Sequence, residues 1–293
     1  MHVFVTGGTG LIGSAVVAEL LAHGHTVLAL ARSDSSAAAV SAAGAAPVRG
    51  ALTAPATLRA AAARSEGVIH LAFSNDFSSE DTVLAAVAEE GAAMAALGEE
   101  LTGSDRPYVT VSGTPMAAGR VATESDPLTA AGPVAGRVQS VTSVLDLATR
   151  GVRSSAIRLP RTVYNNGTGG FTGILTNAAR QSGVAGYPGD GTQRWPAVHA
   201  LDAAVLFRLA LEKAPAGTAW HAVGDEGVAV RDMATVIGRR LGVPVESVPP
   251  EAFGPLAEIF ALDQPASSVH TREALGWEPK QPGLLADLEN IQP

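Results

Sequence analysis

A glycine-rich segment near the start of the chain has the residue types and spacing of a phosphate-binding turn. Residues 6–13 read Thr-Gly-Gly-Thr-Gly-Leu-Ile-Gly. Gly7 permits a tight turn, Gly10 lets the backbone approach a pyrophosphate, and Gly13 lets a helix pack closely on a sheet. The free N–H groups and the positive dipole end of that helix then face the phosphates. The segment predicts a dinucleotide site, and the alternative is a purely structural turn. The expected contacts are Thr6, Gly7, Gly10, Leu11, Ile12 and Gly13.

The residues after the second apolar run indicate which dinucleotide the site prefers. A carboxylate at the end of the second strand would hold the ribose 2′-hydroxyl of NAD, but the chain has Ala31 there. Arg32 can instead pair with a 2′-phosphate as a charged fork, and Ser33 can add a hydroxyl. These residues predict NADP as the cofactor. The alternative interpretation is that Arg32 is a solvated arginine on the surface.

The elements around the turn predict a parallel sheet. Residues 3–5 and 26–30 are short apolar strands, and the apolar residues between 11 and 21 have helical spacing. Strand, helix and strand within about 30 residues form a βαβ unit. We therefore expect an α/β fold with a doubly wound parallel Rossmann sheet. Further strands are expected at 48, 67–72, 108–111 and 155–159, and further helices at 56–64, 80–101 and 134–150.

The sequence changes character after Pro160. Loops rich in glycine and proline follow, and helices are expected at 203–213, with Asp202 as its N-cap, and at 230–241. We expect a dinucleotide-binding Rossmann domain over residues 1–164. Residues 165–293 are expected to form a smaller, mostly substrate-binding part, some segments of which return to the Rossmann sheet.

Composition and charge exclude several classes of protein. Hydrophobic residues make up 46% and charged residues 16% of the chain, which excludes a mostly disordered protein. The net charge is −8 and positive charge is not clustered, so we expect no nucleic-acid partner. The absence of cysteine excludes disulfides and thiolate metal sites, and no run of about 18 apolar residues predicts a membrane span. The first residues resemble a strand and not a signal peptide, so we expect a cytoplasmic enzyme with a small-molecule substrate.

Several separate motifs resemble the short-chain dehydrogenase/reductase superfamily, in its extended or atypical branch of NAD(P)-dependent epimerase/dehydratase-like proteins. Besides the fingerprint at 6–13, they are Val-Ile-His-Leu-Ala at 68–72, Ile-Arg-Leu-Pro at 157–160, Val-His-x-x-Asp at 198–202 and Leu-Gly-Trp-x-Pro at 275–279. The resemblance spans the chain. It implies further cofactor contacts at Leu52, Leu71, Ala72, Pro160 and Val163.

The tyrosine and lysine on which this superfamily usually depends are missing. In the superfamily, a Tyr donates a proton and a Lys four residues later lowers the Tyr pKa and holds the ribose. No tyrosine of this chain has a lysine four residues later. The superfamily's spacing puts Pro133 and Arg137 at these positions. Pro133 has no proton to donate, whereas Arg137 can bind ribose hydroxyls or be an ordinary arginine on a helix surface.

The remaining catalytic candidates follow the predicted strands. Ser112 and Thr114 end the fifth strand, where the superfamily's hydroxyl polarises the substrate oxygen, and the alternative is a turn-forming Ser-Gly-Thr. Tyr164 is the first candidate proton donor, and His199 is the second. Asn75 and Asp76 follow the fourth strand and are expected to line the pocket. His70 is interpreted as a core histidine, and the histidines have no spacing that predicts a metal site.

These observations favour an NADP(H)-dependent oxidoreductase that acts on a small carbonyl or alcohol. One alternative is a sugar-nucleotide epimerase or dehydratase, which the branch of the superfamily suggests. Another is a non-catalytic NADP-binding sensor that regulates a partner, since such a protein would lack the tyrosine and lysine. We also expect a homodimer, because relatives pair through the helices that correspond to 80–101 and 134–150, and both carry apolar residues on more than one face.

Overall fold

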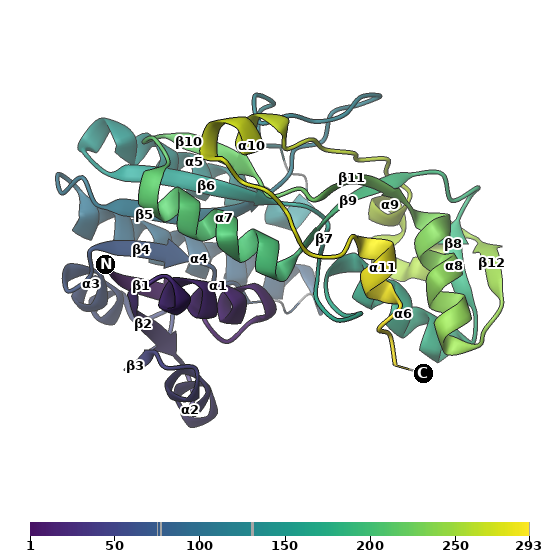
Figure 1. The fold of residues 1–293 in the computed structure, drawn as a ribbon, viewed down its shortest axis with the longest axis horizontal. Coiled ribbons are helices and arrows are strands. Elements are labelled where there is room, and N and C mark those ends of the chain that lie inside the picture. The colour runs from purple at the N-terminus through teal and green to yellow at the C-terminus, as the bar shows by residue number, and fades with distance from the viewer. Residues whose placement is uncertain (75, 77, 130–131, 293) are drawn as a thin grey trace.

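A seven-stranded parallel sheet forms the centre of the computed structural model, which describes residues 1–74, 76, 78–129 and 132–292. The strand order is β10-β6-β5-β4-β1-β2-β3 (Figure 1). Because the chain order reverses between β1 and β4, a crevice opens beyond the carboxyl ends of these two strands. The strands are β1 (His2–Thr6), β2 (Thr26–Ala31), β3 (Ala46–Arg49), β4 (Gly67–His70), β5 (Pro107–Gly113), β6 (Arg153–Leu159) and β10 (Thr218–His221).

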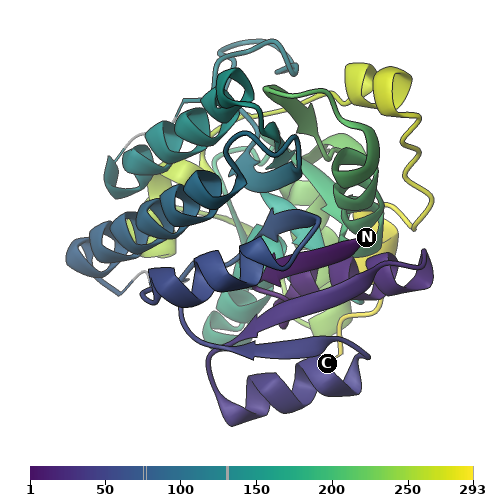
Figure 2. The same ribbon diagram turned by 90° about the vertical axis from the view of Figure 1, so that its left-hand side faces the viewer.

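Helices cover both faces of this sheet, as Figure 2 shows from the side. Successive side chains of a strand point to opposite faces, so Val3 and Val5 of β1 belong to one hydrophobic cluster and Phe4 belongs to the other. The first cluster lies under α1 (Leu11–Ala22) and α7 (Ala200–Lys213). The second lies under α3 (Pro55–Ala63), α4 (Glu80–Leu101) and α5 (Gly136–Asp146). The Rossmann fold expected from the sequence is confirmed.

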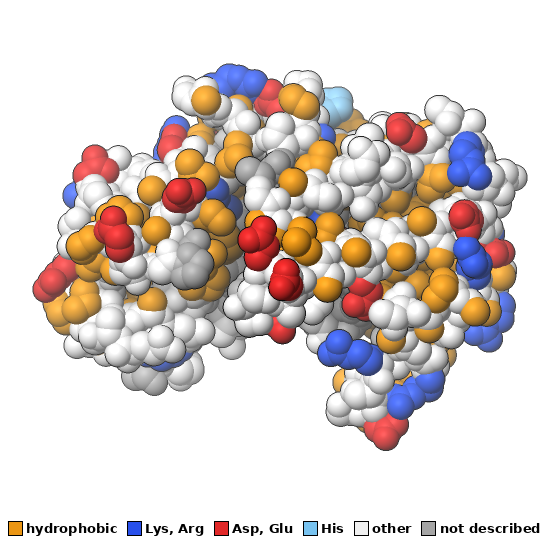
Figure 3. All heavy atoms as spheres, turned by 180° about the vertical axis from the view of Figure 1, so that it is seen from behind, with side chains coloured by type: hydrophobic (Ala, Val, Ile, Leu, Met, Phe, Trp, Pro, Cys, Tyr) orange, Lys and Arg blue, Asp and Glu red, His pale blue; other side chains and the backbone are white. Residues whose placement is uncertain are grey.

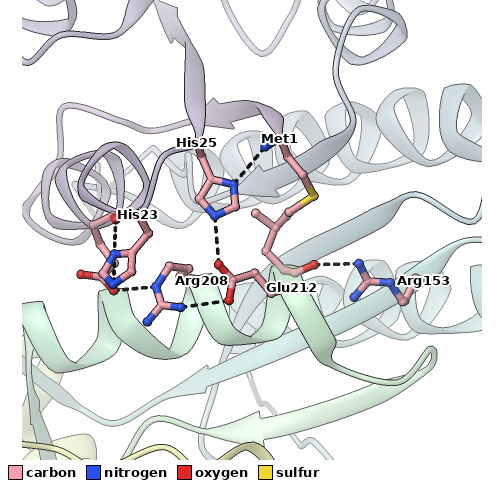
Figure 4. Close-up of polar contacts among 8 residues, drawn as sticks. Met1, His23, His25, Arg153, Arg208 and Glu212 are labelled. Carbon is pink, nitrogen blue, oxygen red and sulfur yellow. Dashed lines mark hydrogen bonds and ion pairs between the residues drawn. The ribbon is translucent and has the colours of Figure 1, made fainter.

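Hydrogen bonds between polar side chains connect α7 to α1 and to His25, which precedes β2 (Figure 4). One carboxylate oxygen of Glu212 on α7 lies 2.9 Å from Nε2 of His25, and the other accepts a hydrogen bond from Arg208 at 2.9 Å. Arg208 also donates to Glu19 of α1 at 2.7 Å. Beside Glu212, Arg153 of β6 donates to the carbonyl of Leu211 at 2.8 Å. These bonds fix the late helix α7 on elements formed early in the chain.

Two local features differ from the sequence expectation. A helix that was not predicted, α2 (Asp34–Ala42), follows β2, and Ser33 caps it by accepting from the N–H of Ser36 while the Ser36 hydroxyl accepts from the N–H of Ser33. The single helix expected at 134–150 is instead a 3₁₀ turn η1 (Gly132–Ala135), α5, and a second 3₁₀ turn η2 (Leu147–Arg150), which ends at Gly151 with a φ of 71°.

The smaller part of the molecule is built from short elements after β6. Three strands form a sheet in the order β11-β9-β7, two more pair as β12-β8, and a third hydrophobic cluster lies between these strands and the helices α6 and α8. The strands are β7 (Thr162–Tyr164), β8 (Ala185–Pro188), β9 (Arg194–His199), β11 (Asp225–Ala229) and β12 (Val245–Val248). Its helices are α6 (Gly170–Ser182), α8 (Val230–Leu241), η3 (Pro250–Leu256), α9 (Ala257–Phe260) and α11 (Leu284–Leu288), whereas α10 (Val269–Leu275) packs on β10 and α7.

Asp202 does not cap α7 as predicted. The N-cap is His199, whose Nδ1 accepts from the N–H of Leu201 at 3.2 Å. Asp202 lies in the first turn, and its carboxylate accepts from the backbone N–H groups of Lys280 and Gln281 at 2.9 and 3.0 Å. The indole N–H of the buried Trp277 donates to the Asp202 carbonyl at 2.9 Å. The start of α7 therefore holds the last segment of the chain.

In the part of the chain that the structure describes, none of the helices combines the length and the hydrophobicity that crossing a bilayer requires.

Candidate functional site

Two cavities that share Gly7, Gly10, Leu71 and Phe73 form one groove along the carboxyl ends of β1, β2, β4 and β5. The first, of about 340 Å³, extends toward β2 and α2, and we call it the adenosine-side cavity. The second, of about 550 Å³, extends toward β5 and β6, and we call it the chemistry-side cavity. Figure 3 shows the surface hollowed beside the projecting part of the molecule that carries α2.

The glycine turn has the geometry that a bound pyrophosphate needs. Gly7 has a φ of +74°, and a Cβ at Gly13 would lie 1.9 Å from the Gly7 carbonyl oxygen, so α1 packs directly on the turn. A Cβ at Gly10 would meet only that oxygen, at 3.5 Å, so it would fill groove space that a ligand can occupy. No side chain caps the N-terminus of α1, which leaves its first N–H groups free for phosphate oxygens.

Thr6 has a different role from the predicted one. Its side chain is fully buried and does not line the groove. Its hydroxyl lies 2.9 Å from Nδ1 of His70 and accepts from the N–H groups of Leu71 and Ala72 at 3.2 Å each. Thr6 therefore positions Leu71 and Ala72, the two residues that follow β4, and both line the groove as expected. His70 is a core residue, and burial lowers its pKa to about 3.

The adenosine-side cavity brings together the residues expected to bind the adenosine ribose and its 2′-substituent. Arg32, Ser33 and Leu52 line it. Arg32 is exposed and forms no ion pair with any residue that the structure describes. The nearest acidic residue in sequence, Asp34, pairs with Arg49 at 2.7 Å. The end of β2 therefore presents a free positive charge to the cavity. Glu89 of α4, which the sequence analysis did not single out, also lines it.

The chemistry-side cavity contains both predicted hydroxyls at the end of β5. Ser112 is buried, and its Oγ has no hydrogen-bond partner among the described residues. Thr114 is fixed through its backbone, because its N–H donates to Leu159 and its carbonyl accepts from the side chain of Gln264. Leu11, Ile12 and Pro160 line the same cavity, as expected. An unpaired buried hydroxyl is costly, so a ligand oxygen that reached the Ser112 Oγ, which itself has almost no accessible surface, would satisfy it.

Arg137 lies in this cavity but is held by a carboxylate that sequence reasoning missed. Its Nε and one Nη donate to the two carboxylate oxygens of Glu90 at 2.7 and 2.8 Å, and its guanidinium lies 4.3 Å from the ring centre of Phe73. Glu90 is fully buried on α4. A glutamate on the inward, otherwise apolar side of that helix was the available signal.

Three further predicted site residues lie outside the groove. Val163 is buried in the main core. The Tyr164 hydroxyl lies 2.9 Å from the Pro282 carbonyl and 3.2 Å from the Asp225 carboxylate, and burial together with that carboxylate raises its pKa above the usual range. His199 is occupied as the cap of α7, with Nε2 3.7 Å from Asp287. Neither Tyr164 nor His199 lines the groove, so these positions do not support the prediction that they donate protons to a substrate.

None of the described residues that line the chemistry-side cavity is a conventional proton donor. Among the described residues that line it, none is His, Tyr, Lys, Asp or Glu. Asp76 does not line the groove; it accepts a hydrogen bond from the N–H of Ser78. Asn75 lies outside the described residues. The described residues contain no group of three or more His, Asp or Glu side chains that could hold a metal ion. The polar side chains of this cavity are Ser112, Thr114, Arg137, Arg161 and Gln264.

Comparisons with known proteins agree with this architecture. An uncharacterized protein of Schizosaccharomyces pombe is 42% identical over 98% of this chain and 98% of its own length. A 4-hydroxy-2-methyl-3-oxo-4-farnesyl-3,4-dihydroquinoline-1-oxide ketoreductase of Stigmatella aurantiaca is 27% identical over 84% of this chain and 75% of its own length. The structure of UDP-glucose 4-epimerase from Thermotoga maritima superposes with a TM-score of 0.79 at 21% identity, and covers 99% of this chain and 97% of that chain.

The sequence family confirms the resemblance stated above. The model of the NAD dependent epimerase/dehydratase family matches residues 3–222, which include the glycine turn, both cavity hydroxyls and, apart from His2, the seven strands of the central sheet. The chain therefore belongs to the NAD dependent epimerase/dehydratase family.

Proposed function

We propose that this protein is an NADP(H)-dependent oxidoreductase that acts on a small carbonyl or alcohol. The observation that carries the proposal is that Ser112, whose buried hydroxyl has no hydrogen-bond partner among the described residues, lines the same groove as the glycine turn. A substrate oxygen placed there satisfies that hydroxyl. The ketoreductase name of the Stigmatella relative supports carbonyl reduction as the reaction class.

In such a reaction, the residues of the groove have different roles. When bound in the groove, a nicotinamide cofactor would supply the hydride chemistry. Ser112 and Thr114 donate hydrogen bonds to the substrate oxygen and stabilise the negative charge that develops on it. Glu90 fixes the guanidinium of Arg137 in the cavity, where its positive charge favours that oxyanion or the ribose hydroxyls. Because the described lining residues include no general acid, the proton comes from water that enters the groove.

Two alternatives remain distinguishable by measurement. An epimerase or dehydratase acting on a sugar nucleotide is compatible with the family, but those reactions in the superfamily also use the missing tyrosine and lysine. A non-catalytic NADP sensor is favoured by the lack of a proton donor in the cavity. The deciding test is NADPH oxidation with a panel of small aldehydes and ketones. Turnover supports the proposal, and tight NADPH binding without turnover of any carbonyl supports the sensor.

The cofactor preference is tested at Arg32. We expect NADPH to bind more tightly than NADH, because the free Arg32 guanidinium can form charge-assisted hydrogen bonds with the 2′-phosphate. Arg32→Ala should weaken NADPH binding by about 10- to 100-fold and leave NADH binding nearly unchanged. Fluorescence titration with both nucleotides measures this. Arg49→Ala is the matched control, since Arg49 is already paired with Asp34. Equal NADH and NADPH affinities in the wild type would contradict NADP as the cofactor.

The expected homodimer is retained as part of the proposal, as is a cytoplasmic location. The helices α4 and α5 pack on each other, and Leu84 of α4 is 47% exposed. We expect light scattering to give twice the monomer mass of 29.6 kDa, and Leu84→Arg to lower that mass because a charge would be buried in the interface. A wild-type protein that scatters as a monomer contradicts this prediction.

A further inference from the structure

Arg161 is a second arginine of the chemistry-side cavity, and the catalytic scheme above does not use it. It lies just after β6 and lines the cavity beside Phe171 and Gln264. Its Nε donates to the side-chain oxygen of Gln264, and one Nη donates to the carbonyl of Ile259 at 2.9 Å. Its guanidinium lies 5.3 Å from the ring centre of Phe171. These neutral contacts fix the orientation of the side chain.

The charge of Arg161 has no counter-charge in the part of the chain that the structure describes. Among the described residues, no carboxylate lies within ion-pair distance of it, whereas Arg137 has Glu90 in the same cavity. Burial lowers the pKa of Arg161 to about 10, and no carboxylate acts in the opposite direction. The group is therefore still positively charged at neutral pH. Partly buried charges are normally paired, so the missing partner points to something that enters the cavity.

Hydrogen-bonding capacity leads to the same conclusion. A guanidinium has five N–H donors. The contacts with Gln264 and Ile259 use Nε and one Nη, and the other Nη has no hydrogen-bond partner among the described residues. The free donors and the uncompensated charge are both suited to a carboxylate or a phosphate, which Arg binds through paired hydrogen bonds.

We propose that the substrate carries one anionic group, a carboxylate or a phosphate ester, and that Arg161 binds it in the cavity that holds Ser112 and Thr114. The inference rests on the proposed function, since it names the substrate class of the same site. Arg161 fixes the anionic end while the hydroxyls at the end of β5 hold the carbonyl oxygen. Phe73 and Phe171 line the same cavity and provide apolar surface for the remainder of the molecule.

A cavity in the smaller part of the molecule indicates that the substrate is a small anion and not a sugar nucleotide. Asp190 and Asp263 line that cavity together with Arg194. Arg194 is already paired with Asp263 at 2.9 Å, so this cavity offers no free positive charge to a diphosphate. A second source of an anion near Arg161 is the cofactor's own pyrophosphate, because Gly10 and Gly13 line the chemistry-side cavity too.

The test compares ligands that differ in charge, and two of them, benzoate and benzamide, have nearly the same shape. Isothermal titration of the NADP⁺-saturated protein uses benzoate, phenyl phosphate and benzamide as probes. We expect at least one anion to bind about 10- to 100-fold more tightly than benzamide. Arg161→Gln should abolish this preference, and Arg161→Lys should keep part of it. Arg180→Gln is the matched control, because Arg180 lies on α6 and donates only to the Gln292 carbonyl.

Each other outcome overturns the inference. The inference is wrong if benzamide binds as tightly as both anions, or if neither anion binds to the wild type. It is also wrong if the anion preference persists in Arg161→Gln. A comparable loss of NADPH affinity in Arg161→Gln would assign Arg161 to the cofactor's pyrophosphate instead. If the wild type binds no nicotinamide nucleotide, the proposed function fails, and the same titrations on the nucleotide-free protein still decide whether Arg161 selects an anion.

Discussion

Gly13→Ala is expected to raise the dissociation constant for NADPH by about 100-fold or more. The new Cβ would lie 1.9 Å from the Gly7 carbonyl oxygen and 2.9 Å from the Gly8 Cα. Both are backbone atoms, so no side-chain rotation relieves the contact, and α1 must move away from the turn. That movement displaces the N–H groups that face the phosphates. Overpacking of this kind also destabilises the fold by about 1–3 kcal/mol. Fluorescence titration and thermal unfolding measure the two effects separately.

Two other glycines provide controls for this experiment. A Cβ at Gly10 meets only the Gly7 oxygen, at 3.5 Å, so Gly10→Ala should weaken NADPH binding without lowering the unfolding temperature. A Cβ at Gly173, inside α6, meets no atom within 4 Å, so Gly173→Ala should bind NADPH normally and unfold at a slightly higher temperature. Wild-type NADPH affinity in Gly13→Ala would show that the phosphates do not bind at this turn.

Removal of the cavity hydroxyls is expected to lower turnover by about 10²- to 10³-fold, as loss of an oxyanion donor does. The variants are Ser112→Ala and Thr114→Val, assayed as kcat and kcat/KM with the best carbonyl substrate. NADPH affinity should stay within a factor of about two. Ser112→Ala carries a second expectation. Because its Oγ has no protein partner, removal of that hydroxyl should leave the free energy of unfolding unchanged or slightly increased.

Tyr164→Phe is the matched control for these variants. It also removes one hydroxyl, but that hydroxyl is bonded to Pro282 and Asp225 outside the groove. Turnover should therefore be unaffected, at a cost in stability of about 1 kcal/mol. The opposite pattern, with Tyr164→Phe inactive and both cavity variants fully active, would refute the assignment of Ser112 and Thr114 and restore Tyr164 as the candidate donor.

Local sequence patterns were enough to predict most of the Rossmann half. The helix expected at 80–101 has those bounds in the structure, because Ser79 and Thr82 form a capping box and Thr102 follows the last turn. The glycine turn was predictable for the same reason, since its function depends on residues close together in the chain. The helix α2 was missed although Ser33 and Ser36 form a similar box, because its alanine-rich sequence has little hydrophobic periodicity.

The parts of the site that sequence reasoning missed depend on contacts between distant residues. Tyr164 follows β6 as a groove residue would, but Asp225 and Pro282, which hold its hydroxyl, lie 61 and 118 residues away. Glu90 was missed because only the packing of α5 on α4 brings Arg137 to it. The free charge of Arg161 was not predictable from the sequence, because it depends on the fold placing no described carboxylate within ion-pair distance of the guanidinium. Sequence patterns identify candidate side chains, and tertiary packing determines which of these side chains are left without a protein partner.

The late return of α7 to the sheet has a consequence for synthesis on the ribosome. The chain has made the glycine turn and six of the seven sheet strands by Leu159, yet α7, which packs on β4, β5 and β6, begins only at Ala200. Its first turn is then held by Trp277 and by the N–H groups of Lys280 and Gln281. At roughly 5–20 residues per second, one face of the sheet stays partly bare for several seconds of translation. During that interval the nascent chain exposes Val109 and Ile157, core residues of that face, and is open to chaperones that bind apolar strands.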